Sequence, residues 1–374
     1  MKIAINTTSA VAGGGVTYLK NLLTYLSKIN TNHQYLILTT LKGKEVFYFQ
    51  HPNFKFLSFR TPSKNSLLRI LWEQLNLPFI LKKEGVNVLF SPGNVCPLFT
   101  QIPNVIMIQN IEPFSNHLSK KRGLRLRLLK LLTMLSIKKA QRVIFPSMRA
   151  RNLIETSGTF VKHAEVIYHG INKEIFHPHT EEDMSYQCKK KYNLDKFILY
   201  VSHIQRYKNF LELIKAFVLL KDKIGNDIQL VFAGGCFDEE YYRKMQDFIR
   251  EHRYEDRIIF LGNVPYEELP FLYSACMIFV YPSTCESFGM TLVEAMACGA
   301  PILTSNIEPM TEICANAAIY FDPTNPAIIA DVIFKTIMDK DVISTLKINL
   351  LKRSKIFSWE NTAIRMLKNF ENIA

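Results

Sequence analysis

Long hydrophobic runs are missing from this sequence: nowhere in its 374 residues do about 18 apolar residues follow one another without charge, the length that a membrane-spanning helix needs. Paired cysteine motifs are missing too. The seven cysteines, an odd number without a C-x-x-C pair, argue against a disulfide framework and against a zinc site. The N-terminus has no charged segment leading into an apolar one, as a secretion signal would. We therefore expect a cytoplasmic protein with reduced thiols.

Acidic residues are outnumbered by basic ones, 33 to 46, and the net charge of +13 predicts an anionic partner: a nucleotide diphosphate, an acidic lipid surface or nucleic acid. No acidic residue occurs between Glu112 and Glu155, where most of the excess charge lies. Within residues 120–142, one helical stripe is formed by Leu124, Leu128, Leu131, Leu132 and Leu135. This segment either makes a peripheral contact with an acidic membrane or packs its leucines into the fold and exposes only its basic face. No recognised motif accompanies the charge, so we expect no nucleic-acid partner.

The length favours two domains, since single cores stop growing at about 250–300 residues. Short apolar runs alternate with amphipathic stretches, which predicts α/β domains with parallel sheets covered by helices. We place one Rossmann-like domain at 1–172, a polar linker at 173–196, a second such domain at 197–356 and a final helical segment at 357–374. Strands are expected at 2–6, 35–39, 86–90, 105–109, 142–146, 165–168, 197–202, 229–233, 257–261, 277–281 and 301–304. Helices are expected at 16–26, 210–220, 239–252, 267–274, 290–297 and 359–373.

Three strand-to-helix loops carry candidate chemistry, because ligands of parallel sheets bind outside the carboxyl ends of the strands. The first is Gly13-Gly14-Gly15, which follows the first strand. Glycines let a backbone approach an anion closely at a helix start, although a tight turn without ligand gives the same pattern. The dinucleotide fingerprint G-x-G-x-x-G is absent, because Tyr18 stands where it requires glycine. A nicotinamide enzyme is therefore disfavoured.

The second loop, residues 203–209, holds His203, Arg206 and Lys208 between a strand and a helix. Cations at the mouth of a parallel sheet suit a diphosphate leaving group, whose negative charge grows as a sugar bond breaks. Lys208 lies nearest the helix start and is the best candidate. The alternative is a plain solvated loop, where lysine and arginine are common.

The third loop, residues 286–294, leads from a strand into a helix expected to begin at Met290. Backbone amides at that helix start favour a phosphate. A carboxylate would be repelled by phosphate, so we expect Glu286 and Glu294 to accept hydrogen bonds from sugar and ribose hydroxyls. Helix-capping or surface glutamates are the alternative.

These residues resemble the E-x7-E motif of the retaining glycosyltransferases of family 4 (glycosyl transferases group 1), and the following Ala295 to Ile302 fits that family's pattern. The resemblance covers nearly the whole chain. It includes the glycine loop, His169 to Asn172, Arg206 to Asn209, Phe232 to Gly235, Phe260 to Gly262 and Phe357 to Trp359. It implies the GT-B fold, in which two Rossmann-like domains face each other across a cleft and a C-terminal helix returns to the N-terminal, acceptor-binding domain.

The resemblance also implies roles for individual residues. Glu286 would bind the transferred sugar, Glu294 the ribose, and Lys208 with Arg206 would offset the diphosphate charge as catalytic groups. The remaining donor-binding positions that it implies are Gly14, Gly15, His203, Val264, Ser287, Phe288, Gly289, Met290 and Thr291.

Two positions depart from the family's pattern. His203 stands where the family often has arginine, which leaves the phosphate contact to Arg206 or weakens it. Gln109 and Asn110 stand where the family often has a His-Asp pair. Their amides can bind an acceptor or sugar hydroxyl but cannot act as a base at neutral pH.

No metal or other cofactor is expected, because a helix N-terminus and cations already offset the diphosphate charge. The only Asp-x-Asp motif, Asp339-Lys340-Asp341, is predicted at a helix junction rather than at a strand mouth. With no carboxylate clearly placed as a nucleophile, the resemblance implies a front-face retaining substitution.

The sequence thus predicts a retaining, metal-independent hexosyltransferase that uses a UDP- or GDP-linked sugar. Its acceptor would be a glycan or a lipid-linked saccharide, in cell-surface polysaccharide biosynthesis, and its place the cytoplasm at the inner face of the membrane. The alternatives are a sugar-nucleotide epimerase of the same fold and a non-catalytic nucleotide-sugar-binding protein.

Overall fold

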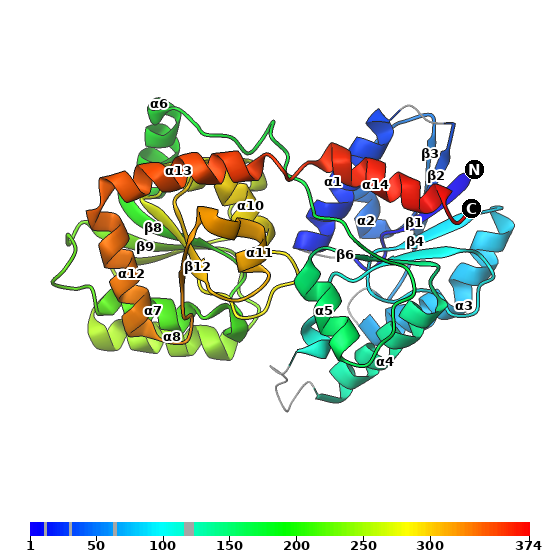
Figure 1. The fold of residues 1–374 in the computed structure, drawn as a ribbon, viewed down its shortest axis with the longest axis horizontal. Helices are drawn as coiled ribbons and strands as arrows, with labels where there is room; N and C mark the ends of the chain where they lie inside the picture. The colour runs from blue at the N-terminus through cyan, green and yellow to red at the C-terminus, as the bar shows by residue number, and fades with distance from the viewer. Residues whose placement is uncertain (11–12, 30–31, 63–65, 116–122) are drawn as a thin grey trace. The chain divides into compact units, whose positions relative to one another are not determined.

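A computed structural model describes residues 1–10, 13–29, 32–62, 66–115 and 123–374. The chain forms two compact units, one of residues 1–170 with 358–374 and one of residues 171–357. Each is a parallel sheet with helices on both faces (Figure 1). The inner strands of each sheet are almost wholly buried, as parallel strands covered on two sides must be, whereas the edge strands are largely half-buried.

Unit 1, residues 1–170 and 358–374, has seven strands in the order β3-β2-β1-β4-β5-β6-β7. Helices α1, α2 and α14 cover one face of this sheet, and α3, α4 and α5 cover the other (Figure 1). The bounds are β1 (Lys2–Asn6), α1 (Gly14–Lys28), β2 (Gln34–Thr40), α2 (Leu41–Phe47), β3 (Phe54–Phe59), α3 (Ser66–Lys83), β4 (Val88–Ser91), β5 (Asn104–Met107), α4 (Gly123–Lys139), β6 (Arg142–Phe145), α5 (Met148–Thr156), β7 (Ala164–Val166) and α14 (Trp359–Glu371).

Unit 2, residues 171–357, has six strands in the order β10-β9-β8-β11-β12-β13. The order in which successive strands are added reverses between β8 and β11, as it does in unit 1 between β1 and β4, and the strands on both sides of each reversal are parallel. The bounds are α6 (Glu181–Met184), β8 (Lys196–Val201), α7 (Phe210–Val218), β9 (Ile228–Ala233), α8 (Glu239–His252), β10 (Ile258–Gly262), α9 (Leu269–Ala275), β11 (Ile278–Tyr281), α10 (Met290–Ala297), β12 (Ile302–Ser305), α11 (Met310–Cys314), β13 (Ile319–Phe321), α12 (Pro326–Met338) and α13 (Lys340–Ser354).

The segment 173–196, expected to be a linker, is not a free connection between the two units. These residues belong to unit 2, where they form α6 and a π-helical stretch, Ser185–Lys191. Phe176, Cys188 and Leu194 are buried, and the ring of Phe176 lies 5.0 Å from that of Tyr266. Scattered apolar residues in a polar segment thus anchor it, which a composition argument does not detect.

The final segment behaves as a returning helix. After leaving unit 2, the chain forms α14, which packs on α1 of unit 1. Trp359 and Phe370 are buried, and the Arg365 guanidinium donates a hydrogen bond to the Glu165 carboxylate of β7 at 2.7 Å. Among the helices in the described ranges, none is long and apolar enough to cross a membrane.

Candidate functional site

Two of the predicted loops lie side by side at the carboxyl edge of the unit 2 sheet. β8 and β11 are hydrogen-bonded parallel neighbours, so the loops after Val201 and Tyr281 leave the same edge at the point where strand order reverses. The Thr284 hydroxyl donates to the Tyr207 carbonyl at 2.9 Å, and the Asn209 amide to the Pro282 carbonyl at 3.1 Å. These bonds hold the two loops against each other.

The result is a cluster of Lys208, Glu286 and Tyr281. The Lys208 ammonium pairs with the Glu286 carboxylate, which also accepts a hydrogen bond from the Tyr281 hydroxyl at 2.6 Å. Both charged side chains are nearly buried, at 11% and 13% exposure. Tyr281 was missed by sequence reasoning, although its place at the end of a predicted strand puts it at the ligand edge.

Glu294 lies deeper, on α10, and is 3% exposed. Burial raises the pKa of its carboxyl group to about 7, against opposing hydrogen bonds from Tyr273 and Tyr266. The Tyr273 hydroxyl donates to it at 3.1 Å. The carboxyl group is therefore available in either protonation state near neutral pH, as donor or acceptor to a hydroxyl.

The turn between these glutamates is shaped by Gly289, whose φ of 94° favours glycine. It caps α10, which begins at Met290 as predicted. The Phe288 ring is buried against Phe357, with centroids 5.9 Å apart, whereas Ser287 and Thr291 are half-buried. The Phe288 side chain is therefore part of the packed core rather than a surface for a ligand.

The remaining candidates of unit 2 lie in two groups. His203 is half-buried beside Phe237, with ring centroids 4.4 Å apart. Burial and the nearby Lys208 charge lower the pKa of His203, so its imidazole is neutral at pH 7. Arg206 instead pairs with Asp238 at 2.9 Å and Glu240 at 3.1 Å, carboxylates that sequence reasoning did not connect with it.

Val264 is half-buried in the loop after β10, close to the glycine turn after β9. The Gly234 amide donates to the Gly262 carbonyl at 2.7 Å. A Cβ on Gly234 would lie 2.1 Å from the Ser202 carbonyl oxygen, so only glycine fits there. The loops after β8, β9 and β10 are therefore drawn together at one edge of the sheet.

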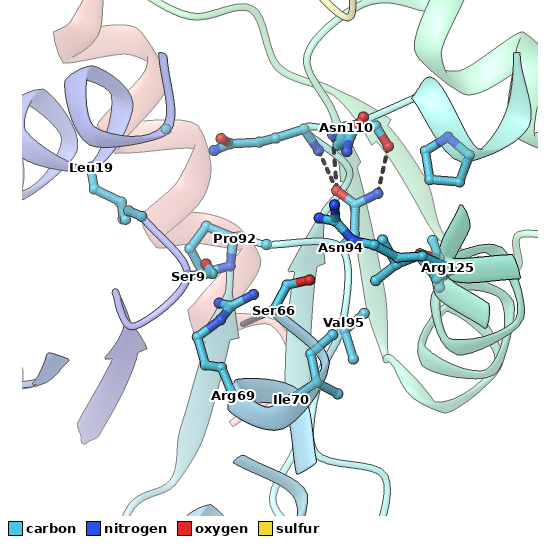
Figure 2. A pocket seen from close by; sticks show the side chains of 17 residues that line it. Ser9, Leu19, Ser66, Arg69, Ile70, Pro92, Asn94, Val95, Asn110 and Arg125 are labelled. Carbon is cyan, nitrogen blue, oxygen red and sulfur yellow. Dashed lines mark hydrogen bonds between the residues drawn. The ribbon is translucent and has the colours of Figure 1, made fainter. Parts of the chain in front are cut away.

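Unit 1 has a pocket of about 310 Å³ at its own point of strand-order reversal (Figure 2). Gly15, Gln109 and Asn110, three of the predicted residues, line it. Asn94 organises this wall: its side-chain oxygen accepts from the amides of Gln109 and Asn110 at 2.9 and 3.0 Å. Its side-chain nitrogen donates to the Asn110 carbonyl at 2.7 Å. Asn94 follows a predicted strand, which is the signal that could have found it.

Two arginines, Arg69 and Arg125, line the same pocket from α3 and α4. Arg69 lies 3.4 Å from the buried carboxylate of Glu73, which also accepts a 2.6 Å bond from the Thr8 hydroxyl. Arg125 is exposed. The pocket thus offers amides, hydroxyls and positive charge, a lining suited to a polar, anionic ligand.

On α4, the packing interpretation of the leucine stripe is wrong for Leu124, Leu128, Leu131 and Leu135, which are exposed. The helix is held instead by its opposite side, including Leu126 and Ile137. Three basic residues of the predicted segment, Lys120, Lys121 and Arg122, lie outside the described residues.

Asp339 caps α13 by accepting from the amides of Asp341 and Val342, both at 3.0 Å. The Asp-x-Asp motif therefore lies at a helix junction, as predicted. Within the described ranges of the chain, no three His, Cys, Asp or Glu side chains gather in a way that could hold a metal ion.

Two family models match consecutive parts of the chain. The model described as Glycosyltransferase Family 4 matches residues 12–175, and the model described as Glycosyl transferases group 1 matches residues 183–350. The two matches correspond to the two units of the structure.

Several curated proteins are similar in sequence. O-antigen chain mannosyltransferase B of Escherichia coli is 31% identical over 186 residues, 49% of this chain and 48% of the relative. O-antigen chain mannosyltransferase RfbU of Salmonella typhimurium is 28% identical over 270 residues, 70% of this chain and 69% of the relative. A Campylobacter jejuni N-acetylgalactosaminyltransferase, named for a diphospho-undecaprenol-linked acceptor, is 25% identical over 82% of this chain and 80% of its own. The match to the first of these spans about half of that protein's length.

Solved structures share the fold over the whole chain. Sucrose-phosphate synthase from Thermosynechococcus elongatus superposes with a TM-score of 0.85 at 19% identity, covering 100% of this chain and 98% of the other. HepE from Anabaena, solved with UDP and glucose, has a TM-score of 0.79 at 19% identity and covers 100% of both chains. These likenesses identify the architecture as GT-B.

Proposed function

Because the chain belongs to the glycosyltransferases of the GT-B fold, we propose that it transfers a hexose-type sugar from a UDP- or GDP-linked donor to a glycan or lipid-linked saccharide. The observation that carries this proposal is the pairing of Lys208 with Glu286 beside the start of α10. The buried Glu294 lies about one helical turn after that start. A cation, a helix N-terminus and two carboxylates at one sheet edge match the diphosphate, sugar and ribose of a nucleotide sugar.

In this proposal Glu286 accepts hydrogen bonds from hydroxyls of the transferred sugar, and Glu294 bonds to the ribose. Lys208 turns its ammonium from Glu286 towards the diphosphate, where negative charge grows as the glycosidic bond to phosphate breaks. The amides of residues 288–291 supply further donors. The neutral imidazole of His203 can donate one hydrogen bond, whereas Arg206 is already engaged by Asp238 and Glu240.

Transfer proceeds with retention and without a metal ion. The cation and the helix N-terminus offset the leaving-group charge, the task that a divalent ion would otherwise perform. A departing phosphate oxygen takes the proton of the incoming acceptor hydroxyl on the same face of the sugar. Neither Gln109 nor Asn110 can act as a base at neutral pH, which is consistent with this role for the leaving group.

The acceptor lies in the unit 1 pocket, where Gln109, Asn110 and the arginines provide polar contacts. The names of the relatives support a place in the biosynthesis of O-antigen-type surface polysaccharide, and one of them supports a lipid diphosphate as carrier. The enzyme then works in the cytoplasm at the inner face of the membrane, in peripheral contact through the basic segment of residues 120–142.

The first test is a thermal-shift panel of UDP, GDP, ADP and their common sugar conjugates. One nucleotide is expected to raise the melting temperature of the wild type by roughly 5 °C at about 100 times its Kd, and Glu294→Ala is expected to lose most of that rise. Glu251→Gln, which changes an exposed glutamate on α8, is the control and is expected to keep it. If no nucleotide raises the melting temperature of the wild type, the proposed donor site is wrong.

The second test measures transfer. Glu286→Gln is expected to lower kcat by about 100-fold or more, because it removes a charge-assisted contact to the transferred sugar, while EDTA leaves the wild-type rate unchanged. Donor epimerised in the absence of acceptor would indicate the epimerase instead. Selective nucleotide binding with no turnover on any lipid-linked or free saccharide would indicate a binding protein.

A further inference from the structure

Helix α4 exposes a continuous ridge of leucines to the outside of unit 1. Leu124, Leu128, Leu131 and Leu135 are 84%, 40%, 52% and 39% exposed. They recur every three or four residues over three turns, on the side opposite to the buried residues of the helix. A ridge of this length on a folded surface marks an interaction site rather than a set of single exposed apolar residues.

Helix α3 exposes a second ridge of the same kind. Leu68, Leu71, Leu75 and Phe79 are 52%, 54%, 59% and 76% exposed. They too recur every three or four residues, opposite to the buried side of α3 that includes Leu77. Because α3 carries apolar residues on both sides, half of its leucines have no core to enter.

The two ridges belong to one surface. α3 and α4 cover the same face of the unit 1 sheet (Figure 1). The segment after β4 joins them: the Gln74 amide donates to the Cys96 carbonyl at 2.9 Å, and the Cys96 amide donates to the Ser136 hydroxyl at 3.1 Å. Phe99, in the same segment, is 79% exposed. We call the α3 ridge, Phe99 and the α4 ridge the α3–α4 face.

Positive charge borders this face on both helices. Arg125, Arg127 and Lys138 of α4 are exposed, as are Lys82 and Lys83 of α3. The only acidic residue within α3 is the buried Glu73, and α4 has none. Apolar ridges flanked by long cationic side chains suit the boundary between lipid headgroups and acyl chains, where the side chains extend to the phosphates.

We propose that the α3–α4 face docks on an anionic lipid bilayer and that α3 and Phe99 contribute to it as much as α4 does. A second copy of the chain is a poorer occupant, since a symmetric contact would set these cations against one another. The pocket of Figure 2 is lined from the same two helices, by Arg69 of α3 and Arg125 of α4. A docked unit 1 would hold the pocket at the bilayer surface, where an acceptor with a lipid-anchored phosphate is presented. The docking deepens the peripheral contact named in the proposed function, and only this last step rests on the proposed lipid-linked acceptor.

Vesicle flotation tests the apolar ridges. Wild-type protein is expected to float with phosphatidylcholine vesicles containing 30 mol% phosphatidylglycerol at about 0.1 M salt, and to bind pure phosphatidylcholine at least tenfold more weakly. Leu75→Asp/Phe79→Asp on α3 and Leu128→Asp/Leu131→Asp on α4 are each expected to lower binding to the anionic vesicles by roughly tenfold or more. Ile348→Asp, at a 67% exposed position of α13 in unit 2, is the control and is expected to bind as the wild type does.

Charge variants test the flanks. Arg127→Gln/Lys138→Gln is expected to weaken binding to anionic vesicles roughly tenfold, because two headgroup contacts are lost. The matched pair Lys221→Gln/Lys223→Gln, exposed in unit 2, removes the same charge and is expected to leave binding unchanged. If both pairs of substitutions weaken vesicle binding equally, binding depends only on net charge, and the proposal is overturned.

The other outcomes are also decisive. Failure of the wild type to bind anionic vesicles, or loss of binding in the α4 variant alone, contradicts the α3–α4 face. The proposal is also contradicted if the wild type is a dimer and the ridge variants convert it to monomers without changing vesicle binding. The nucleotide-dependent thermal shift of the same variants separates the two proposals: it should persist in all of them, and its absence from the wild type would reject the donor site while leaving the docking result intact.

Discussion

The carboxyl group of Glu294 couples stability to pH. Burial raises its pKa from 4.5 to about 7, so between these values the folded protein holds a proton that the unfolded chain has released. Because the folded state binds more protons, the free energy of unfolding falls as pH rises through this window, by up to about 3 kcal/mol in total. Above pH 7 both states are ionised and this contribution changes no further.

Urea denaturation at pH 5 and pH 8 measures this coupling. Glu294→Gln keeps a group that accepts from Tyr273 but cannot ionise, so its stability should fall less between the two pH values than that of the wild type. Glu251→Gln, at an exposed position, should follow the wild type. Identical pH dependence in all three proteins would mean that Glu294 does not titrate in this window.

At the residue scale, the sequence was sufficient to place those side chains whose position depends on spacing and on the ends of recognisable strands. Glu286 and Lys208 lie 78 positions apart, yet each follows a recognisable buried strand, and neighbouring parallel strands bring their ends together. The partners of Arg206 could not be predicted, because the direction of a long side chain depends on carboxylates of another element, Asp238 and Glu240. The glutamine and asparagine pair at 109–110 was located, but Asn94, which orients it, was not.

At the scale of elements, one close approach fixes the start of α14. A Cβ added to Gly170 would lie 2.0 Å from the Trp359 backbone nitrogen and 2.5 Å from the Ser358 carbonyl carbon. Backbone atoms cannot rotate aside, so Gly170→Ala should lower the free energy of unfolding by about 2–3 kcal/mol. Gly123→Ala, where nothing lies within 4 Å of the added atom, should change it by less than about 0.5 kcal/mol. Urea denaturation compares the two, and equal effects would contradict the steric argument.

Elements with one clear apolar side or an uninterrupted apolar run were predictable. The helices Glu239–His252 and Met290–Ala297 have the bounds that their patterns indicated. β3 and α3 were not anticipated. The apolar residues of α3 surround the helix, because one side enters the core and the other forms a surface ridge, so no polar face indicates its orientation.

At the scale of the whole molecule, the chain enters unit 2 at Ile171 and leaves it at Phe357, so unit 1 is built from both ends of the sequence. Sequence reasoning found this return from the resemblance carried by the final tryptophan segment. It placed residues 173–196 outside unit 2, because a polar composition does not distinguish a free linker from a segment anchored by a few buried side chains such as Phe176.

Removal of residues 358–374 therefore tests how the two units are stabilised. The truncation uncovers surfaces that α14 buries: Trp359 packs near Tyr18 with ring centroids 5.6 Å apart, and Phe370 near Phe90 at 5.5 Å. Several large side chains would become exposed, each contributing about 1.5–3 kcal/mol when buried, so unit 1 should unfold at a markedly lower temperature or fail to fold. Unit 2 keeps its whole sheet and Glu294. Calorimetry should accordingly show an early or absent transition for unit 1 and a second transition that the preferred nucleotide still raises. Loss of nucleotide stabilisation together with α14 would mean instead that the donor site depends on unit 1.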